Sequence, residues 1–167
     1  MVKAIVYTSK TGNTKEYARL LGEKLALPYY DVKTAIHKLP KNTEIIYLGW
    51  LMAGILKGHK KANKHFNIEA VCPVGMLNVK EQLDNIIKVN KIQSGIQVFC
   101  LDGGLEIDRL NGISKLVMKI MKSGITKGLS EKQNKTEDDE KMLKFVQNCC
   151  SLVDETNLGE IIRWYSK

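Results

Sequence analysis

The sequence has few of the residues and runs that mark several classes of protein. Its 167 residues include only 3 Pro and 13 Gly, too few for a low-complexity or collagen-like chain. Long hydrophobic runs are also lacking, and the apolar stretch Ala4–Tyr7 is too short for a signal-peptide core or a membrane span. We therefore expect a single folded domain over residues 1–167, located in the cytoplasm.

Cysteine and histidine are scarce and are not spaced as metal ligands. The four cysteines contain no C-x-x-C pair, so neither a disulfide framework nor a zinc site is indicated. The three histidines form no H-x-x-x-H or H-E-x-x-H motif, because His59 and His65 are six residues apart and His37 is remote. We expect no bound metal and reduced, mostly buried thiols. The cysteines are Cys72, Cys100, Cys149 and Cys150.

Acidic residues are outnumbered by basic ones, 18 against 26, which gives a formal charge of +8 at pH 7. Residues 1–100 carry 15 Lys+Arg and 7 Asp+Glu, whereas residues 101–167 carry 11 of each. Within this second part, Arg109–Lys135 holds seven basic residues and one acid. Aromatic residues make up only 7% of the chain, and no RNP-like motif is present. Nucleic-acid binding is therefore not expected.

Alternating segments predict an α/β fold. Short apolar, β-branched runs of the kind found in buried parallel strands alternate with segments of helical periodicity. Five strands and two early helices are predicted, an order typical of a doubly wound parallel sheet with helices on both faces. The strands are Lys3–Thr8, Tyr29–Val32, Glu44–Gly49, Ile68–Val74 and Ile96–Leu101. One helix follows Gly12 and stops before Pro28, and the other is Gln82–Val89.

Two further helices are expected to close the domain. The first has apolar residues at i, i+3, i+4, i+7 and i+8, with lysines on the opposite side. Core packing is its simplest role, and contact with a membrane surface is the alternative. The apolar residues are Ile113, Leu116, Val117, Ile120 and Met121, and the lysines are Lys115, Lys119 and Lys122.

The second of these helices begins near Thr136, because Asp139 occupies the acid position of a capping box. Between the two helices, Lys122–Lys135 is polar and contains glycine, and is predicted to be a mobile loop. The expected core face of the second helix consists of Met142, Val146, Cys149 and Val153.

The most informative stretch lies between the first predicted strand and the first predicted helix. It contains three hydroxyls and a glycine that permits a tight turn before a helix N-terminus, a combination that suits a phosphate group. Neither the Walker spacing nor G-x-G-x-x-G is present, so a single phosphate, as in a mononucleotide, fits better. A Ser/Thr-rich cap without a ligand is the alternative. The stretch reads Thr8-Ser9-Lys10-Thr11-Gly12-Asn13-Thr14.

This stretch resembles the flavodoxin signature S/T-x-T-G-x-T, which in that family wraps the phosphate of FMN. The resemblance implies a flavodoxin-like doubly wound five-stranded parallel sheet in the order 2-1-3-4-5, with the ligand at the carboxyl ends of strands one and three. It also implies FMN as the cofactor. The residues that match the signature are Ser9, Lys10, Thr11, Gly12, Asn13 and Thr14.

The same resemblance assigns two further loops to the flavin. After the third strand, an aromatic residue and glycines stand where flavodoxins hold the isoalloxazine ring, and Trp50 either contacts the flavin or belongs to the core. After the fifth strand, a glycine-rich loop offers backbone amides and a carbonyl to the ring's pyrimidine side. The first loop is Gly49-Trp50-Leu51-Met52-Ala53-Gly54, and the second is Asp102-Gly103-Gly104-Leu105.

Beyond these loops, the basic run Leu110–Gly128 resembles the segment that follows the last strand in bacterial flavodoxin-type protoporphyrinogen oxidases. Those relatives oxidise protoporphyrinogen IX with FMN and pass electrons to a quinone in the membrane. The resemblance therefore implies an FMN-dependent oxidoreductase with an anionic substrate, a quinone or redox protein as partner, and a peripheral membrane contact. The alternative is a non-catalytic FMN shuttle that docks on an acidic redox partner. No protein side chain is expected to be catalytic, because the flavin carries the redox chemistry.

Four lysines recur at i, i+3, i+4 and i+7 beside two histidines, His59 and His65. This stripe is either a solvated helix face or a docking patch for an anionic partner, a membrane or a propionate-bearing substrate. The lysines are Lys57, Lys60, Lys61 and Lys64.

Overall fold

The computed structural model describes residues 1–76, 78–104, 112–132, 134, 136, 139–140, 143–144, 146 and 151–167. The chain divides into two compact units. The first unit comprises Met1–Gly103 together with Val153–Lys167, and the second is Gly104–Leu152. The second unit is therefore an insertion in the sequence of the first, whereas the sequence pattern predicts one domain.

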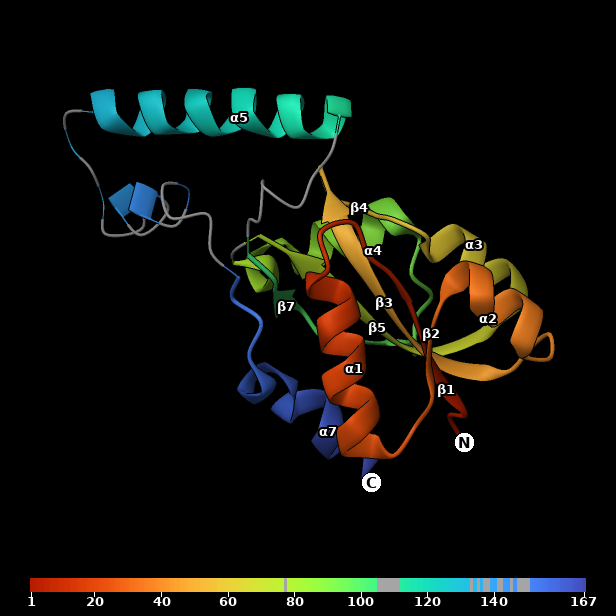
Figure 1. The fold of residues 1–167 in the computed structure, drawn as a ribbon. Coiled ribbons are helices and arrows are strands. Elements are labelled where there is room, and N and C mark those ends of the chain that lie inside the picture. Colours follow the sequence, from red (N-terminus) through yellow and green to blue (C-terminus); the bar gives the residue numbers. More distant parts are fainter. Residues whose placement is uncertain are drawn as a thin grey trace. The chain divides into compact units, whose positions relative to one another are not determined.

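A seven-stranded, mostly parallel sheet runs through the first unit (Figure 1). Its order is β2-β1-β3-β5-β6, with β4 antiparallel to β3 and β7 parallel to β5. The predicted α/β class is confirmed, and this arrangement is compatible with a flavodoxin-like fold. The strands are β1 Ala4–Thr8, β2 Tyr29–Asp31, β3 Glu44–Met52, β4 Ile55–Leu56, β5 Asn67–Gly75, β6 Gln97–Val98 and β7 Leu101–Asp102.

Helices cover both faces of the sheet. Consecutive residues of a strand point to opposite sides, so each strand contributes to the core on both faces. Ala4 and Val6 of β1 pack into one core cluster with residues of α2, α3 and α4, whereas Ile5 packs into the other with α1 and α7. Both clusters lie in the first unit. The helices are α1 Asn13–Leu25, α2 Val32–Lys38, α3 His59–His65, α4 Leu83–Asn90 and α7 Gly159–Tyr165, with short 3-10 turns η1 Val79–Gln82 and η3 Glu155–Leu158.

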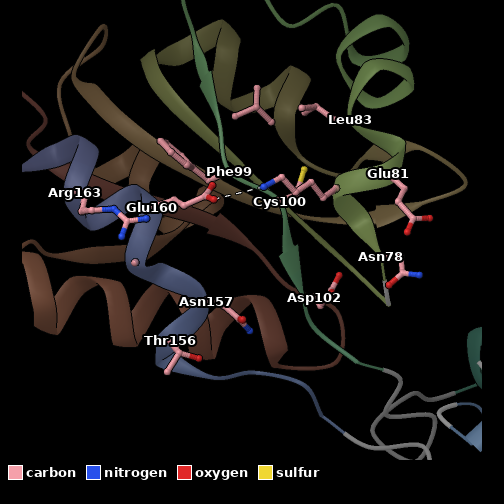
Figure 2. Close-up of a pocket in the computed structure, with 13 residues that line it drawn as sticks. Asn78, Glu81, Leu83, Phe99, Cys100, Asp102, Thr156, Asn157, Glu160 and Arg163 are labelled. Carbon is pink, nitrogen blue, oxygen red and sulfur yellow. Dashed lines mark ion pairs between the residues drawn. The ribbon is translucent and has the colours of Figure 1, made fainter. Parts of the chain in front are cut away.

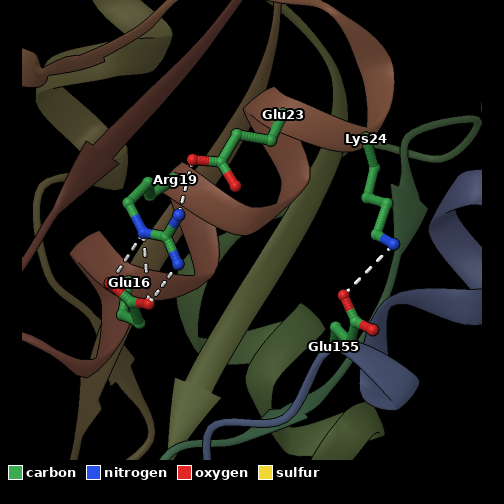
Figure 3. A network of polar contacts seen from close by, with 5 residues as sticks. All are labelled: Glu16, Arg19, Glu23, Lys24 and Glu155. Atoms are coloured by element: carbon green, nitrogen blue, oxygen red, sulfur yellow. Dashed lines mark hydrogen bonds and ion pairs between the residues drawn. The ribbon is translucent and has the colours of Figure 1, made fainter.

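The outer face of α1 carries a small charged network (Figure 3). The guanidinium of Arg19 pairs with Glu16 at 2.7 Å and with Glu23 at 2.5 Å. Lys24 reaches Glu155 of η3 at 3.1 Å. All these side chains are substantially exposed, so the pairs contribute little to stability.

The predicted strand Ile96–Leu101 is split into β6 and β7, and Pro73 explains the interruption. The register does not change across the break, since Val71 pairs with Val98 and Val74 with Leu101. The N–H of Phe99 donates to the carbonyl of Val71 at 2.9 Å. The return bond to Phe99 would have to come from position 73, where proline has no N–H.

In the second unit, α5 spans Gly112–Glu131, so the loop predicted over Lys122–Lys135 is wrong as far as Glu131. Half-buried Ile125 and Leu129 continue an i, i+4 apolar repeat, which overrides the glycines. The core role expected of Leu116 and Ile120 is also wrong, because they are 60% and 64% exposed. The side chains of Ile113, Val117 and Met121 lie outside the described residues. No described helix is long and apolar enough to cross a membrane.

The predicted capping box is confirmed. The N–H of Asp139 donates to Thr136 Oγ1 at 3.2 Å, and the N–H of Thr136 donates to Asp139 Oδ2 at 2.8 Å. Hydrogen bonds from Lys132 and Thr136 lower the pKa of Asp139 to about 2. Val146 is buried as expected. The helical position predicted for Val153 is wrong, because residues 152–154 are not helical and Val153 packs against the core of the first unit. Met142 and Cys149 lie outside the described residues, as does Cys150.

Candidate functional site

The predicted phosphate turn joins β1 to α1 at the carboxyl end of β1. Gly12 has φ 110°, a left-handed conformation that suits glycine, and its N–H donates to Ser9 Oγ at 3.1 Å. Gly12 is the N-cap of α1, and this glycine has no side chain of its own to cap the helix. Ser9 and Thr11 are half-buried and Lys10 is exposed. The turn therefore presents hydroxyls, a lysine and a helix N-terminus, which is a donor set that fits an oxyanion.

The signature residues Asn13 and Thr14 are the first residues of α1, and both are buried. The Asn13 amide donates to the carbonyl of Gly103, directly beyond β7. One turn along α1, the Tyr17 hydroxyl donates to the carbonyl of Asp102 at 2.7 Å and accepts from Asn157 Nδ2 at 2.7 Å. The structure thus brings the predicted first and last loops together through Asn13 and Tyr17, and Asn157 of η3 bonds to the same hydroxyl. The role of Tyr17 was missed because this residue fits the apolar pattern of α1. The role of Asn157 was missed because it lies 140 residues along the chain from Tyr17.

The third strand runs beside the turn. Thr8 pairs with Gly49, so Ser9 continues past β1 next to the position of Trp50. The expected loop Gly49–Gly54 is mostly strand, because β3 continues to Met52. Ala53 and Gly54 alone form a turn, both with positive φ (49° and 76°), as in a type I′ hairpin.

Trp50 belongs to neither core cluster and is half-buried. The Lys57 ammonium lies 6.0 Å from the centre of its ring, within cation–π range. At the tip of the hairpin, Met52 and Ile55 are 50% and 47% exposed. Leu51 is half-buried. The β3–β4 hairpin and the residue that follows it therefore present an aromatic ring, two apolar side chains and a cation.

Asn90 on α4 fixes this hairpin in place. Its amide nitrogen donates to the carbonyls of Gly54 and Ile86, both at 2.8 Å, and its oxygen accepts from the N–H of Leu56 at 2.7 Å. The side chain satisfies one backbone group in the hairpin turn, one on β4 and one on its own helix. The position of the hairpin is therefore determined by a residue that the sequence analysis did not single out.

The loop after the last strand differs from its expected role. Asp102 Oδ1 accepts from the N–H of Val79 at 3.1 Å, and the N–H of Gly103 donates to the carbonyl of Gly75 at 2.7 Å. The Gly103 amide, expected to serve a ligand, is therefore already used, because β7 continues its pairing with β5. Gly104 belongs to the second unit, and Leu105 lies outside the described residues.

Tyr47 of β3 connects the end of β1 to the start of the lysine-rich helix. Its hydroxyl donates to the carbonyl of Lys57 at 2.6 Å and shares a 2.9 Å hydrogen bond with Thr8 Oγ1. Burial raises the pKa of Tyr47 well above its usual value, so the phenol stays neutral. Gly58 packs against the same two hydroxyls.

The predicted lysine stripe is divided by the start of α3 at His59. Lys60, Lys61 and Lys64 are exposed on this helix, while Lys57 precedes it and lies over Trp50. His59 is buried, its ring centre lies 6.0 Å from that of Tyr47, and its Nε2 has no hydrogen-bond partner among the described residues. Burial lowers the pKa of His59.

A cavity of about 720 Å³ lies in another part of the first unit (Figure 2). Of the predicted cofactor residues, only Asp102 lines it. Cys100 also lines it, but burial and the Asp102 carboxylate raise the pKa of this thiol to about 11, so it is no thiolate nucleophile. Cys72 is fully buried, and both cysteines are free thiols as expected.

No family model matches the chain, and no curated protein or solved structure matches it.

Proposed function

We propose that this protein binds FMN and acts as a flavodoxin-like oxidoreductase. The observation that carries the proposal is the Ser9–Gly12 turn, which leads from the end of β1 into the start of α1, beside β3. The sheet order supports it. With the β4 hairpin set aside and β6 and β7 counted as one interrupted strand, the order reads 2-1-3-4-5, and its switch point lies between β1 and β3.

In this proposal the turn residues Ser9, Lys10, Thr11 and Gly12 bind the phosphate together with the first N–H groups of α1. Trp50 and the hairpin tip flank the ring. FMN supplies the electron-transfer chemistry when it is bound. The chain's own residues orient the cofactor, exclude water and surround it with positive charge from Lys10 and Lys57.

The proposed substrate is protoporphyrinogen IX or a similar carboxylate-bearing molecule, with electrons passed to a quinone or a redox protein. The exposed lysines of α3 support an anionic substrate, because they place positive charge on the helix that follows the β3–β4 hairpin. We place the protein in the cytoplasm, in peripheral contact with the membrane that holds the quinone.

An absorbance spectrum of the purified protein, followed by an FMN titration monitored by flavin fluorescence, tests cofactor binding. Thr11→Asp places a carboxylate against the phosphate and is expected to abolish binding. Thr34→Asp, at an exposed position of α2, is the matched control and is expected to leave binding unchanged. A protein that neither carries nor takes up FMN contradicts the proposal. FMN-loaded protein that fails to oxidise protoporphyrinogen IX with a quinone acceptor contradicts the proposed substrate only.

The exposed apolar tip of the hairpin favours a second candidate, an FMN electron shuttle that docks on an acidic partner. Met52 and Ile55 offer a small apolar contact, and the lysines around α3 offer charge complementarity. A shuttle is expected to be reduced in two resolved one-electron steps and to transfer electrons to a protein in a salt-dependent reaction. Salt-independent transfer to a free quinone alone contradicts this candidate.

A further inference from the structure

The 720 Å³ cavity opens along the free edge of the sheet, at the break between β6 and β7. Figure 2 shows Glu160 and Arg163 on one side of it and Glu81 and Leu83 on the other, with Cys100 between. These two sides are the two helix layers that cover the sheet. The cavity therefore occupies the space in which the next strand of the sheet would lie. Its volume is within the range of small-molecule sites, about 300–1,000 Å³.

Backbone groups of the edge strand point into this cavity. Phe99 and Gly103 turn their N–H groups toward β5, where they donate to Val71 and Gly75. Alternate residues of a strand direct their backbone groups to opposite sides, so Val98 and Cys100 direct N–H and C=O away from β5. Both residues line the cavity, and on this side β6 and β7 have no neighbouring strand among the described residues. The edge therefore offers donors and acceptors side by side, in the plane of the sheet.

The surroundings of this edge suit a flat molecule. Half-buried apolar side chains of Leu83, Val98 and Phe99 line the cavity. On the α7 side, Gly159 leaves room, since a Cβ at this position would meet nothing within 4 Å. A ligand that hydrogen-bonds to the edge lies in the plane of the sheet and is held between the two helix layers. A planar ring satisfies both conditions, because it can bond to the edge through its rim while its faces contact the two helix layers.

The charges of the lining nearly cancel. Lys80 and Glu160 pair with each other across the cavity at 3.5 Å. The Asp102 carboxylate is held by the N–H of Val79. Arg163 and Glu81 then contribute one charge of each sign. This balance favours an uncharged ligand over a phosphate or another anion.

We propose that the cavity is a binding site for an uncharged planar heteroaromatic molecule in which a hydrogen-bond donor lies next to an acceptor, as in a nucleobase or a ring carboxamide. The site is separate from the proposed phosphate turn and shares only Asp102 with the predicted cofactor residues. The inference does not require FMN to bind, so it stands or falls independently of the proposed function.

The test is an NMR titration of the full-length, ¹⁵N-labelled, FMN-free protein with adenosine and, separately, with nicotinamide. We expect saturable shifts of the Val98 and Cys100 amide signals with at least one probe, and the probe that binds identifies the ring type. If adenosine binds, N6,N6-dimethyladenosine serves as the control, because its exocyclic nitrogen has no N–H to donate. It is expected to bind about tenfold more weakly than adenosine. Equal binding of the dimethyl probe overturns recognition by the edge, and the absence of any shift with both probes overturns the site.

A pair of variants on α4 distinguishes this cavity from weak binding elsewhere. Leu83→Glu places a charge in the apolar lining and is expected to remove the shifts, and Glu is favourable at the start of a helix. Val89→Glu changes an exposed residue of the same helix and is expected to leave them unchanged. Undiminished binding by folded Leu83→Glu protein overturns the proposal, as does AMP binding far more tightly than adenosine.

Discussion

Gly58 lies where the end of β1, the core residue Tyr47 and the start of α3 meet. Its φ is +84°, and a Cβ there would lie 2.1 Å from Thr8 Oγ1 and 2.3 Å from the Tyr47 hydroxyl oxygen. Gly58→Ala therefore adds a collision to left-handed strain and is expected to cost about 2–4 kcal/mol in the free energy of unfolding. Urea denaturation measures this loss.

Gly95→Ala is the matched control for Gly58→Ala. Its φ is +99°, but a Cβ there would meet nothing within 4 Å, so Gly95→Ala carries the strain without the collision. We expect a cost of about 1 kcal/mol for this variant. Equal losses for the two alanine variants would show that Gly58 is not packed against Thr8 and Tyr47.

His59 gives the protein a pH-dependent term in its stability. Burial lowers its pKa in the folded state, so below the unfolded value of about 6.5 the unfolded chain binds a proton that the folded chain does not. The free energy of unfolding is therefore expected to fall as the pH drops from 7.5 to 5, by at most about 1.4 kcal/mol per pH unit from this group. Urea denaturation at several pH values measures the slope.

The contribution of His59 to the pH dependence of stability is measured by comparing the unmodified protein with variants that lack this histidine. His59→Phe and His59→Gln remove the titrating group, and the other two histidines, His37 and His65, remain in every variant. Both are expected to show a shallower decline toward low pH than the unmodified protein, whatever their stability at pH 7.5. A parallel decline in all three proteins would assign the pH dependence to other groups.

At the scale of elements, the β3–β4 hairpin depends on the side chain of Asn90. Asn90→Ala removes three hydrogen bonds, and the expected cost is about 2–3 kcal/mol of unfolding free energy. Lys88→Ala on the exposed side of the same helix is expected to stay within about 0.5 kcal/mol. Hydrogen exchange at Leu56, whose N–H donates to Asn90, is expected to accelerate only in Asn90→Ala. Unchanged protection there would refute the anchoring role.

Elements with a strong local pattern were predictable from the sequence, and the others depend on distant residues. Local sequence alone predicts four of the elements. These are the strands β1, β3 and β5, from their apolar runs, and the helix α1, from its amphipathic pattern. Helices α2 and α7 have seven residues each, too few for a clear periodicity, and α7 is stabilised by packing Ile161 against α1 and the sheet. The interruption between β6 and β7 arises from Pro73, a residue in a neighbouring strand.

The candidate site also combines features that local sequence predicts with contacts between residues far apart in the chain. The Ser9–Gly12 turn was predictable because a strand, a turn and a helix follow one another in sequence. The contact of Asn13 with Gly103, 90 residues away, was not, because topology rather than local pattern brings them together. The cavity at the sheet edge was missed for the same reason, since its lining comes from three separate stretches of chain.

At the scale of the whole molecule, nearly all the described core belongs to one unit. Both core clusters are built from residues of Met1–Gly103 and Val153–Lys167, and Val146 is the buried apolar residue described in the insertion. The two ends of the first unit at the insertion are close together. The carbonyl of Asp102 and the amide of Asn157 both bind the hydroxyl of Tyr17, each at 2.7 Å.

This proximity predicts that the insertion can be removed. Replacing Gly104–Leu152 by a Gly/Ser linker of about six residues closes a short gap at little entropic cost, so the shortened protein is expected to fold with an unfolding free energy within about 1 kcal/mol of the full chain. Circular dichroism and urea denaturation measure this. Tyr17→Phe in the shortened protein removes the hydroxyl that joins the two ends and is expected to cost about 1–2 kcal/mol. An unfolded shortened protein would mean that the first unit requires the insertion. If it folds and binds FMN as the full chain does, the proposed cofactor site lies within the first unit. The insertion is then expected to contact the substrate, the redox partner or the membrane.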